Sequence, residues 1–160
     1  MENINKKELT ITRIFKAPCE LVWRYWTEPE YFKKWWGPRF FSSPTCRIDF
    51  KVGGKYLHCM KDQSGKKFWN TGIYKEIIPF KKIVASDSFS DEKGNIIPAS
   101  QHGMEGFPLE LEIVVMFEKQ DEKTKMTLIH SGIEHIDSKS RKNMQQGWRE
   151  SFDKLAENLK

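Results

Sequence analysis

The sequence predicts an α+β domain in which a curved antiparallel sheet is covered by one long C-terminal helix. Two observations indicate this class. Residues 138–159 repeat apolar side chains at helical spacing over a length that can cover a sheet. Most of residues 46–131 alternate between apolar and polar side chains, which is typical of antiparallel strands with one buried face. A sheet with one apolar face needs a cover, and the C-terminal helix is the only expected element of sufficient size.

The C-terminal helix is expected to start after Asp137 or Ser138, since either side chain can accept a hydrogen bond from a free backbone N–H. Gly147 lies inside this helix. A glycine there costs about 1 kcal/mol of helix stability relative to alanine. We therefore expect another part of the protein to pack so closely against Gly147 that no side chain would fit. The apolar stripe of the helix consists of Met144, Trp148, Phe152, Leu155 and Leu159.

The N-terminal part of the chain predicts one strand and two short helices. Residues 1–7 are polar, and we expect them to be disordered, whereas residues 8–15 alternate as a strand does. One short helix is expected over Cys19–Trp26. A second starts near Pro29, because proline fits the first turn of a helix, and ends near Trp36.

About six antiparallel strands fill the middle of the chain, separated by glycine-containing or polar turns. Residues 90–108 interrupt them with no clear periodicity. A loop of this length is usually functional or mobile. The expected strands are residues 46–51, 55–60, 67–77, 82–89, 109–118 and 125–131.

Length and composition fit a single globular domain, residues 1–160. Hydrophobic residues make up 38% and charged residues 31%, which is ordinary, whereas aromatic residues reach 13%. This aromatic content indicates either a large core or a cavity with flat apolar walls.

The charge pattern argues against nucleic acid as a partner. The net charge is +5, but acidic and basic residues are interleaved, as on a solvated surface, and form no basic stripe. No apolar run reaches the roughly 18 residues of a membrane span. Cys19, Cys46 and Cys59 form no CxxC pair, and the N-terminus lacks an apolar signal core, so we expect reduced thiols and a cytoplasmic protein.

No catalytic motif is present: the sequence has no phosphate-binding glycine loop, no HExxH and no GxSxG. We therefore predict no catalytic residue, no cofactor and no metal site. The four histidines are His58, His102, His130 and His135, and of these His58 and His130 can both face inward from separate strands. A hydrogen-bonded strand histidine is more common than a metal ligand, and a ligand-contacting histidine is the alternative.

Other candidates follow from strand and helix phase. Asp87 is in phase with Ile83, Ala85 and Phe89, so its carboxylate points either into a cavity or, at a sheet edge, into water. Trp69 and Tyr74 lie an odd number of positions apart on one expected strand, so their side chains point to opposite faces and only one of them is expected to face inward. The helix stripe forms either plain core or cavity wall. The expected ligand-binding residues are His58, Tyr74, Asp87, His130, Met144, Trp148 and Phe152.

Five segments, in order, resemble a known superfamily: FKAPCELVWRYWTEPEYFKKWWGP, VGGKYLHCM, GIYKEIIPFKKI, SFSDEKGN and GWRESFDKLAENL. They resemble the SRPBCC (START-like, helix-grip) proteins, and within them the group similar to the activator of the ninety-kilodalton heat-shock chaperone's ATPase. The resemblance implies a sheet of about seven strands that grips the C-terminal helix, with a cavity between them. Residues 90–108 look like a feature of the subfamily, and we place them near the mouth of that cavity. The eukaryotic activator carries a further N-terminal domain that this sequence does not show.

Three functions follow as expectations. The first is a binding protein for a small hydrophobic or amphipathic ligand, held between the sheet and the C-terminal helix. The second, implied by the resemblance, is an enzyme similar to polyketide cyclases or aromatases, in which His58, His130 and Asp87 transfer protons. The third is a module that binds a chaperone or another protein partner through the exposed sheet face or the Trp35–Trp36 region. The sequence does not predict an oligomeric state.

Overall fold

A computed structural model describes residues 2–4, 7–102 and 106–160, and its described strands form one antiparallel sheet. The sheet has eight strands in the order β1-β2-β8-β7-β6-β5-β4-β3. The strands are β1 (Glu2–Ile4), β2 (Glu8–Phe15), β3 (Cys46–Ile48), β4 (Lys55–Lys61), β5 (Lys67–Ile78), β6 (Lys82–Ser90), β7 (Leu111–Gln120) and β8 (Lys123–Ser131).

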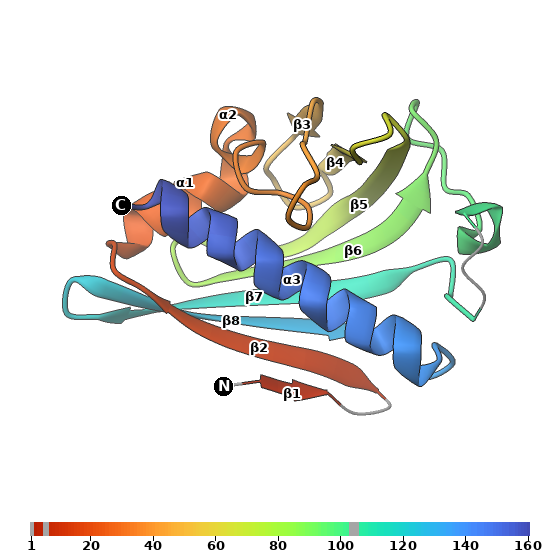
Figure 1. The fold of residues 1–160 in the computed structure, drawn as a ribbon. Helices are drawn as coiled ribbons and strands as arrows, with labels where there is room; N and C mark the ends of the chain where they lie inside the picture. Colours follow the sequence, from red (N-terminus) through yellow and green to blue (C-terminus); the bar gives the residue numbers. More distant parts are fainter. Residues whose placement is uncertain (1, 5–6, 103–105) are drawn as a thin grey trace.

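The helices lie on one face of this curved sheet (Figure 1). The long helix α3 (Ser138–Asn158) crosses the sheet diagonally, and α1 (Cys19–Thr27) and α2 (Pro29–Phe32) lie near its C-terminal end. A short 3-10 turn, η1 (Ala99–His102), lies in the long connection between β6 and β7. The predicted helix-grip architecture is thus confirmed, because alternation in the strands and the stripe on α3 each leave one apolar face to bury.

Several element boundaries differ from the expectation. Glu2–Ile4 forms β1 and pairs with Leu9–Ile11, so this part of the N-terminus is not disordered. The outer edge of β2 offers unpaired backbone groups that a short polar segment can satisfy. Helix α2 ends at Phe32, earlier than expected. Strand β7 starts at Leu111, and Leu109 is exposed.

Aromatic side chains hold α3 on the sheet. The ring of Trp26 from α1 lies with its centroid 4.8 Å from that of Trp35, and 6.3 Å from those of both Trp148 and Phe152. Phe152 and Leu155 of α3 are fully buried. Burying an apolar side chain of this size contributes about 2 to 3 kcal/mol, so these contacts dominate the attachment of the helix.

Helix α3 has the N-terminal cap that the sequence predicts, but the surroundings of Gly147 differ from the expectation. The Asp137 side chain caps the helix by accepting a hydrogen bond of 2.7 Å from the N–H of Ser140. A Cβ atom at Gly147 would meet only Pro38 Cγ, at 3.5 Å, which is ordinary van der Waals contact. The expected neighbour is therefore present but does not require a glycine.

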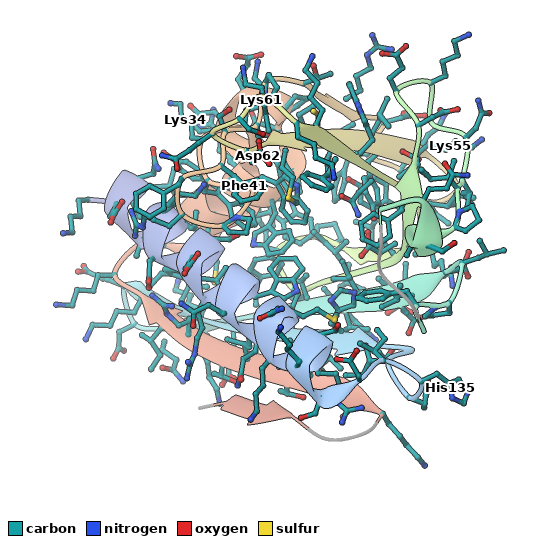
Figure 2. All side chains as sticks on the ribbon, turned by 45° about the vertical axis from the view of Figure 1, so that its right-hand side comes forward. Lys34, Phe41, Lys55, Lys61, Asp62 and His135 are labelled. Carbon is teal, nitrogen blue, oxygen red and sulfur yellow. The ribbon has the colours of Figure 1, made fainter. Side chains whose placement is uncertain are left out.

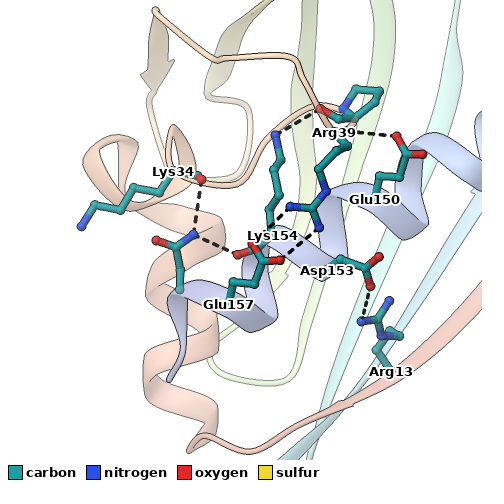
Figure 3. A network of polar contacts seen from close by, with 9 residues as sticks. Arg13, Lys34, Arg39, Glu150, Asp153, Lys154 and Glu157 are labelled. Carbon is teal, nitrogen blue, oxygen red and sulfur yellow. Dashed lines mark hydrogen bonds and ion pairs between the residues drawn. The ribbon is translucent and has the colours of Figure 1, made fainter.

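A polar network joins the C-terminal half of α3 to the segment after α2 (Figure 3). The Lys154 ammonium donates to the carbonyl oxygens of Pro38 and Phe41, at 3.2 Å each. The Arg39 guanidinium pairs with Glu157, and the Arg39 N–H donates to Glu150 Oε1. Burial and the nearby Arg39 lower the pKa of Lys154. The segment that carries Pro38 and Phe41 is thus fastened to the helix. A further link in the network joins Arg13 of β2 to Asp153.

His58 on β4 is part of the core. Its ring stacks on Tyr56 and lies against Phe32, with centroids 4.3 and 4.0 Å apart. Neither ring nitrogen has a hydrogen-bond partner. Burial without a partner disfavours the charged form, and it lowers the pKa of His58 to about 3.

This buried histidine predicts a loss of stability in acid. Unfolded His58 gains a proton below about pH 6.5, whereas folded His58 stays neutral down to about pH 3, so the unfolded state binds more protons between these values. His58 therefore does not reduce the free energy of unfolding above pH 6.5. Below pH 6.5 the free energy of unfolding decreases as the pH decreases, and at pH 4 this group alone has lowered it by about 3 kcal/mol. We expect His58→Phe to lose less stability than the wild type between pH 7 and pH 4 in urea unfolding.

The control for this experiment is His135→Asn. His135 projects into solvent from the loop before α3 (Figure 2), so its replacement should leave the pH dependence of unfolding unchanged. Parallel curves for His58→Phe and the wild type would contradict the assignment of the acid sensitivity to His58.

Two glycines predict opposite effects of alanine. Gly147→Ala should raise the free energy of unfolding by up to about 1 kcal/mol, because the helix gains propensity and the new Cβ fits beside Pro38. Gly72→Ala should lower it, because the new Cβ would overlap the Ser86 carbonyl oxygen and the Tyr56 ring. Urea unfolding measures both, and a destabilised Gly147→Ala would show that this site is more crowded than the geometry indicates.

Candidate functional site

A pocket of about 430 Å³ lies between the N-terminal half of α3 and the inner face of the sheet. The segment that follows α2 closes one side of it, and residues from β4 to β8 form its floor. The residues that line it are Trp36, Gly37, Pro38, Phe41, Met60, Phe68, Asn70, Asp87, Ser88, Phe89, Phe107, Leu111, His130, Ser140, Asn143, Met144, Gly147, Trp148 and Ser151.

Aromatic rings make up much of the wall. They come from separate parts of the chain, since α3, β5, β6 and both flanking loops each contribute at least one. Phe107 belongs to the long connection between β6 and β7 and packs edge-on against Phe89, with centroids 5.9 Å apart. This confirms that the connection reaches the cavity. The six aromatic residues of the wall are Trp36, Phe41, Phe68, Phe89, Phe107 and Trp148.

The polar part of the wall centres on His130 of β8 and Asp87 of β6. The Trp148 indole N–H donates to His130 Nδ1 at 3.1 Å. An indole nitrogen can only donate, so Nδ1 carries no proton in this arrangement and the single ring proton lies on Nε2. Nε2 is 3.3 Å from Asp87 Oδ2 but lacks hydrogen-bond alignment. In this arrangement the ring N–H of His130, on Nε2, faces the carboxylate.

Asp87 has further contacts, and all of them come from uncharged donors. The Tyr56 hydroxyl lies 3.3 Å and the Asn70 amide nitrogen 3.4 Å from Oδ1. Tyr56 donates its stronger bond, of 2.7 Å, to the carbonyl oxygen of Ser86. Burial, together with the charge of Asp87, raises the pKa of Tyr56, so the phenol keeps its proton. These long contacts leave the carboxylate incompletely satisfied.

Four of the seven residues expected to bind a ligand line the pocket, and three do not. Asp87, His130, Met144 and Trp148 are in the lining. His58 lies among core rings, Tyr74 packs edge-on against Phe50 at 5.0 Å, and Phe152 is fully buried in the core. The periodicity of the strands and of the helix correctly predicted that these three side chains face inward. They pack against other core side chains, however, and do not border the pocket.

The remaining candidates give no metal or nucleophile. His135 is exposed, and the side chain of His102 lies outside the described part of the structure. Among the described residues, no group of three His, Cys, Asp or Glu side chains could hold a metal ion. Cys19, Cys46 and Cys59 are free thiols, and burial raises the pKa of Cys46 to about 12, so this group is not a thiolate at neutral pH.

Sequence reasoning missed many wall residues, and several of the aromatic ones lie in loops. Trp36 and Pro38 belong to the Trp-Trp-Gly-Pro turn and Phe41 follows it, whereas Phe107 lies in the connection without periodicity. Loop residues have no phase that assigns them a face. The high aromatic content was the one signal available, and it indicated a cavity without locating its walls.

Chemically, the site offers an apolar surface with one carboxylate and one imidazole. No lysine or arginine is among the lining residues that the structure describes. Separately, no helix within the described ranges is both long and apolar enough to cross a bilayer.

Solved structures of the same fold cover nearly the whole chain. A protein from Chromobacterium violaceum is 24% identical, with a TM-score of 0.79 over 97% of this chain and 98% of that chain. One from Nitrosomonas europaea is 26% identical, with a TM-score of 0.76 over 97% and 95%. The AHSA1 protein from Silicibacter pomeroyi is 19% identical, with a TM-score of 0.76 over 95% and 96%.

A comparison with curated protein sequences finds no match. A family model, described as Activator of Hsp90 ATPase homolog 1-like protein, matches residues 16–160. This match runs from the end of β2 through α3, so it includes every pocket-lining residue. The chain therefore belongs to the Activator of Hsp90 ATPase homolog 1-like family, within the helix-grip superfamily.

Proposed function

We propose that this protein binds a small apolar or amphipathic molecule in the pocket under the N-terminal half of α3. The pocket volume, about 430 Å³, lies within the range typical of small-molecule sites. Its wall combines six aromatic residues with a few polar groups, which is the usual composition of such sites.

The observation that carries this proposal is a sizeable cavity beneath α3 whose wall is mainly apolar. Protein interiors are normally packed with few voids larger than a water molecule, whereas the space here is about 430 Å³ and six aromatic residues line it. The polar side chains in this wall, among them Asn70 and Asp87, would fix the orientation of a bound molecule.

The enzyme alternative depends on the His130–Asp87 pair. A general base needs a free lone pair that faces the substrate. On His130, Nδ1 accepts from Trp148 and Nε2 carries the proton, so the imidazole has no lone pair to offer. Asp87 could accept a proton by itself, but His58 is stacked in the core and does not complete the expected set. The geometry thus favours binding over proton transfer. Interaction with a chaperone stays a prediction from the family.

A pocket-filling variant tests the proposal. We expect the wild type to bind the uncharged fluorescent probe N-phenyl-1-naphthylamine with micromolar affinity, measured as an increase in probe emission. Gly147→Phe would place a ring in the space beside Pro38 and should weaken binding by at least about tenfold.

Two controls accompany this variant. Gly147→Ala adds one methyl group at the same site, and Gln146→Phe adds the same ring at an exposed neighbour outside the lining. Both should bind the probe as the wild type does, and melting temperatures show that all variants fold. Absence of probe binding by the wild type, or equal binding by a folded Gly147→Phe, would overturn the proposal.

A further inference from the structure

We propose that the pocket selects an organic cation, namely an apolar or aromatic amine, over neutral or acidic molecules of the same shape. This inference rests on the proposed binding function and adds the charge of the ligand. It follows from three features of the wall: one carboxylate, no compensating cation, and a surround of aromatic rings.

The first feature is the isolation of Asp87 as a charge. It is the one Asp or Glu among the described residues that line the pocket, and no Lys or Arg is found there. Its side chain is 12% exposed, so the carboxylate is largely removed from water yet reachable from the pocket. A buried charge is costly unless it is paired. The partners within the chain, Tyr56 and Asn70, are uncharged and distant, at 3.3 and 3.4 Å.

The second feature is the hydrogen bond that Trp148 donates to His130 Nδ1. A protonated imidazole next to Asp87 would supply the missing cation, but it would carry a proton on both ring nitrogens. The Trp148 N–H, 3.1 Å from Nδ1, would then face another donor. While Trp148 donates to Nδ1, His130 does not supply the missing cation, and the described residues of the wall give Asp87 no other counter-ion. An ammonium group in the pocket would provide one and would also donate a hydrogen bond.

The third feature is the aromatic wall. The faces of aromatic rings carry partial negative charge and attract cations, most strongly where water is excluded. The six aromatic residues around the pocket thus favour a cation in addition to the ion pair with Asp87. A carboxylate ligand would meet the same rings and Asp87 as repulsive neighbours, which disfavours fatty acids and other organic anions.

A matched series of three naphthalene compounds tests the inference at pH 7 with the wild-type protein. They are 2-naphthylmethylamine, 2-naphthalenemethanol and 2-naphthoic acid, which differ in one substituent and are a cation, a neutral molecule and an anion. Isothermal titration calorimetry should give an amine affinity at least about tenfold above that of the alcohol, with the acid weakest.

Two variants locate the source of the preference. Asp87→Asn keeps the size of the side chain and removes its charge, and the advantage of the amine over the alcohol should fall to within about twofold. Glu110→Gln removes an exposed carboxylate that does not line the pocket, and it should keep the wild-type order. The wild-type series alone decides the charge preference if Asp87→Asn does not fold.

The binding results distinguish failure of this inference from failure of the proposed function. If the alcohol or the acid binds as tightly as the amine, the pocket binds small molecules without selecting a cation, and the inference is overturned. If none of the three binds and N-phenyl-1-naphthylamine does not bind either, the proposed function fails together with it. An amine preference that persists in a folded Asp87→Asn would overturn the role of Asp87.

Discussion

The packing of α3 on the aromatic side chains of α1 and the turn after α2 determines the rest of the molecule. Trp26 and Trp35 meet Phe152 with centroids 6.3 and 6.0 Å away, and Leu155 is fully buried one turn further on. A helix of this length is marginal in water without a surface to lie on. Every contact that makes α3 stable therefore also fixes its distance from the sheet.

These contacts divide α3 into two halves with different tasks. The C-terminal half carries Phe152 and Leu155 in the core and Lys154 in the network to the Pro38 segment. The N-terminal half carries Met144 and Gly147 in the pocket wall. Trp148 lies at the junction, where its ring stacks toward Trp26 and its N–H binds His130. The cavity exists because packing is complete on one side of Trp148 and incomplete on the other.

The sequence predicted the elements well because their periodicity follows directly from burial. The alternation from Leu111 to Phe117 and the stripe on α3 each identify a buried face. Phase identifies a face but not how far the core is filled beneath it, which is why Tyr74 and His58 were expected at the pocket and lie in packed core. Asp87 was identified because a carboxylate in phase with apolar residues is unusual.

The wall residues in loops could not be predicted in this way. Phe41 and Phe107 reach the pocket through turns whose course depends on tertiary contacts and not on local spacing. Strand β1 was missed for a related reason: its pairing partner, the edge of β2, exists only once the sheet has formed. The polar contacts of Asp87 likewise join it to residues from three other strands, and no local sequence pattern predicts these contacts.

The fastening of the Pro38 segment to α3 has a consequence for how a molecule enters. Lys154 binds the carbonyl oxygens of Pro38 and Phe41, and Arg39 binds Glu150 and Glu157, so this segment and the helix are joined at several points. Widening of that seam would break several charge-assisted bonds at once. A molecule therefore does not enter between α3 and the Pro38 segment while these bonds hold.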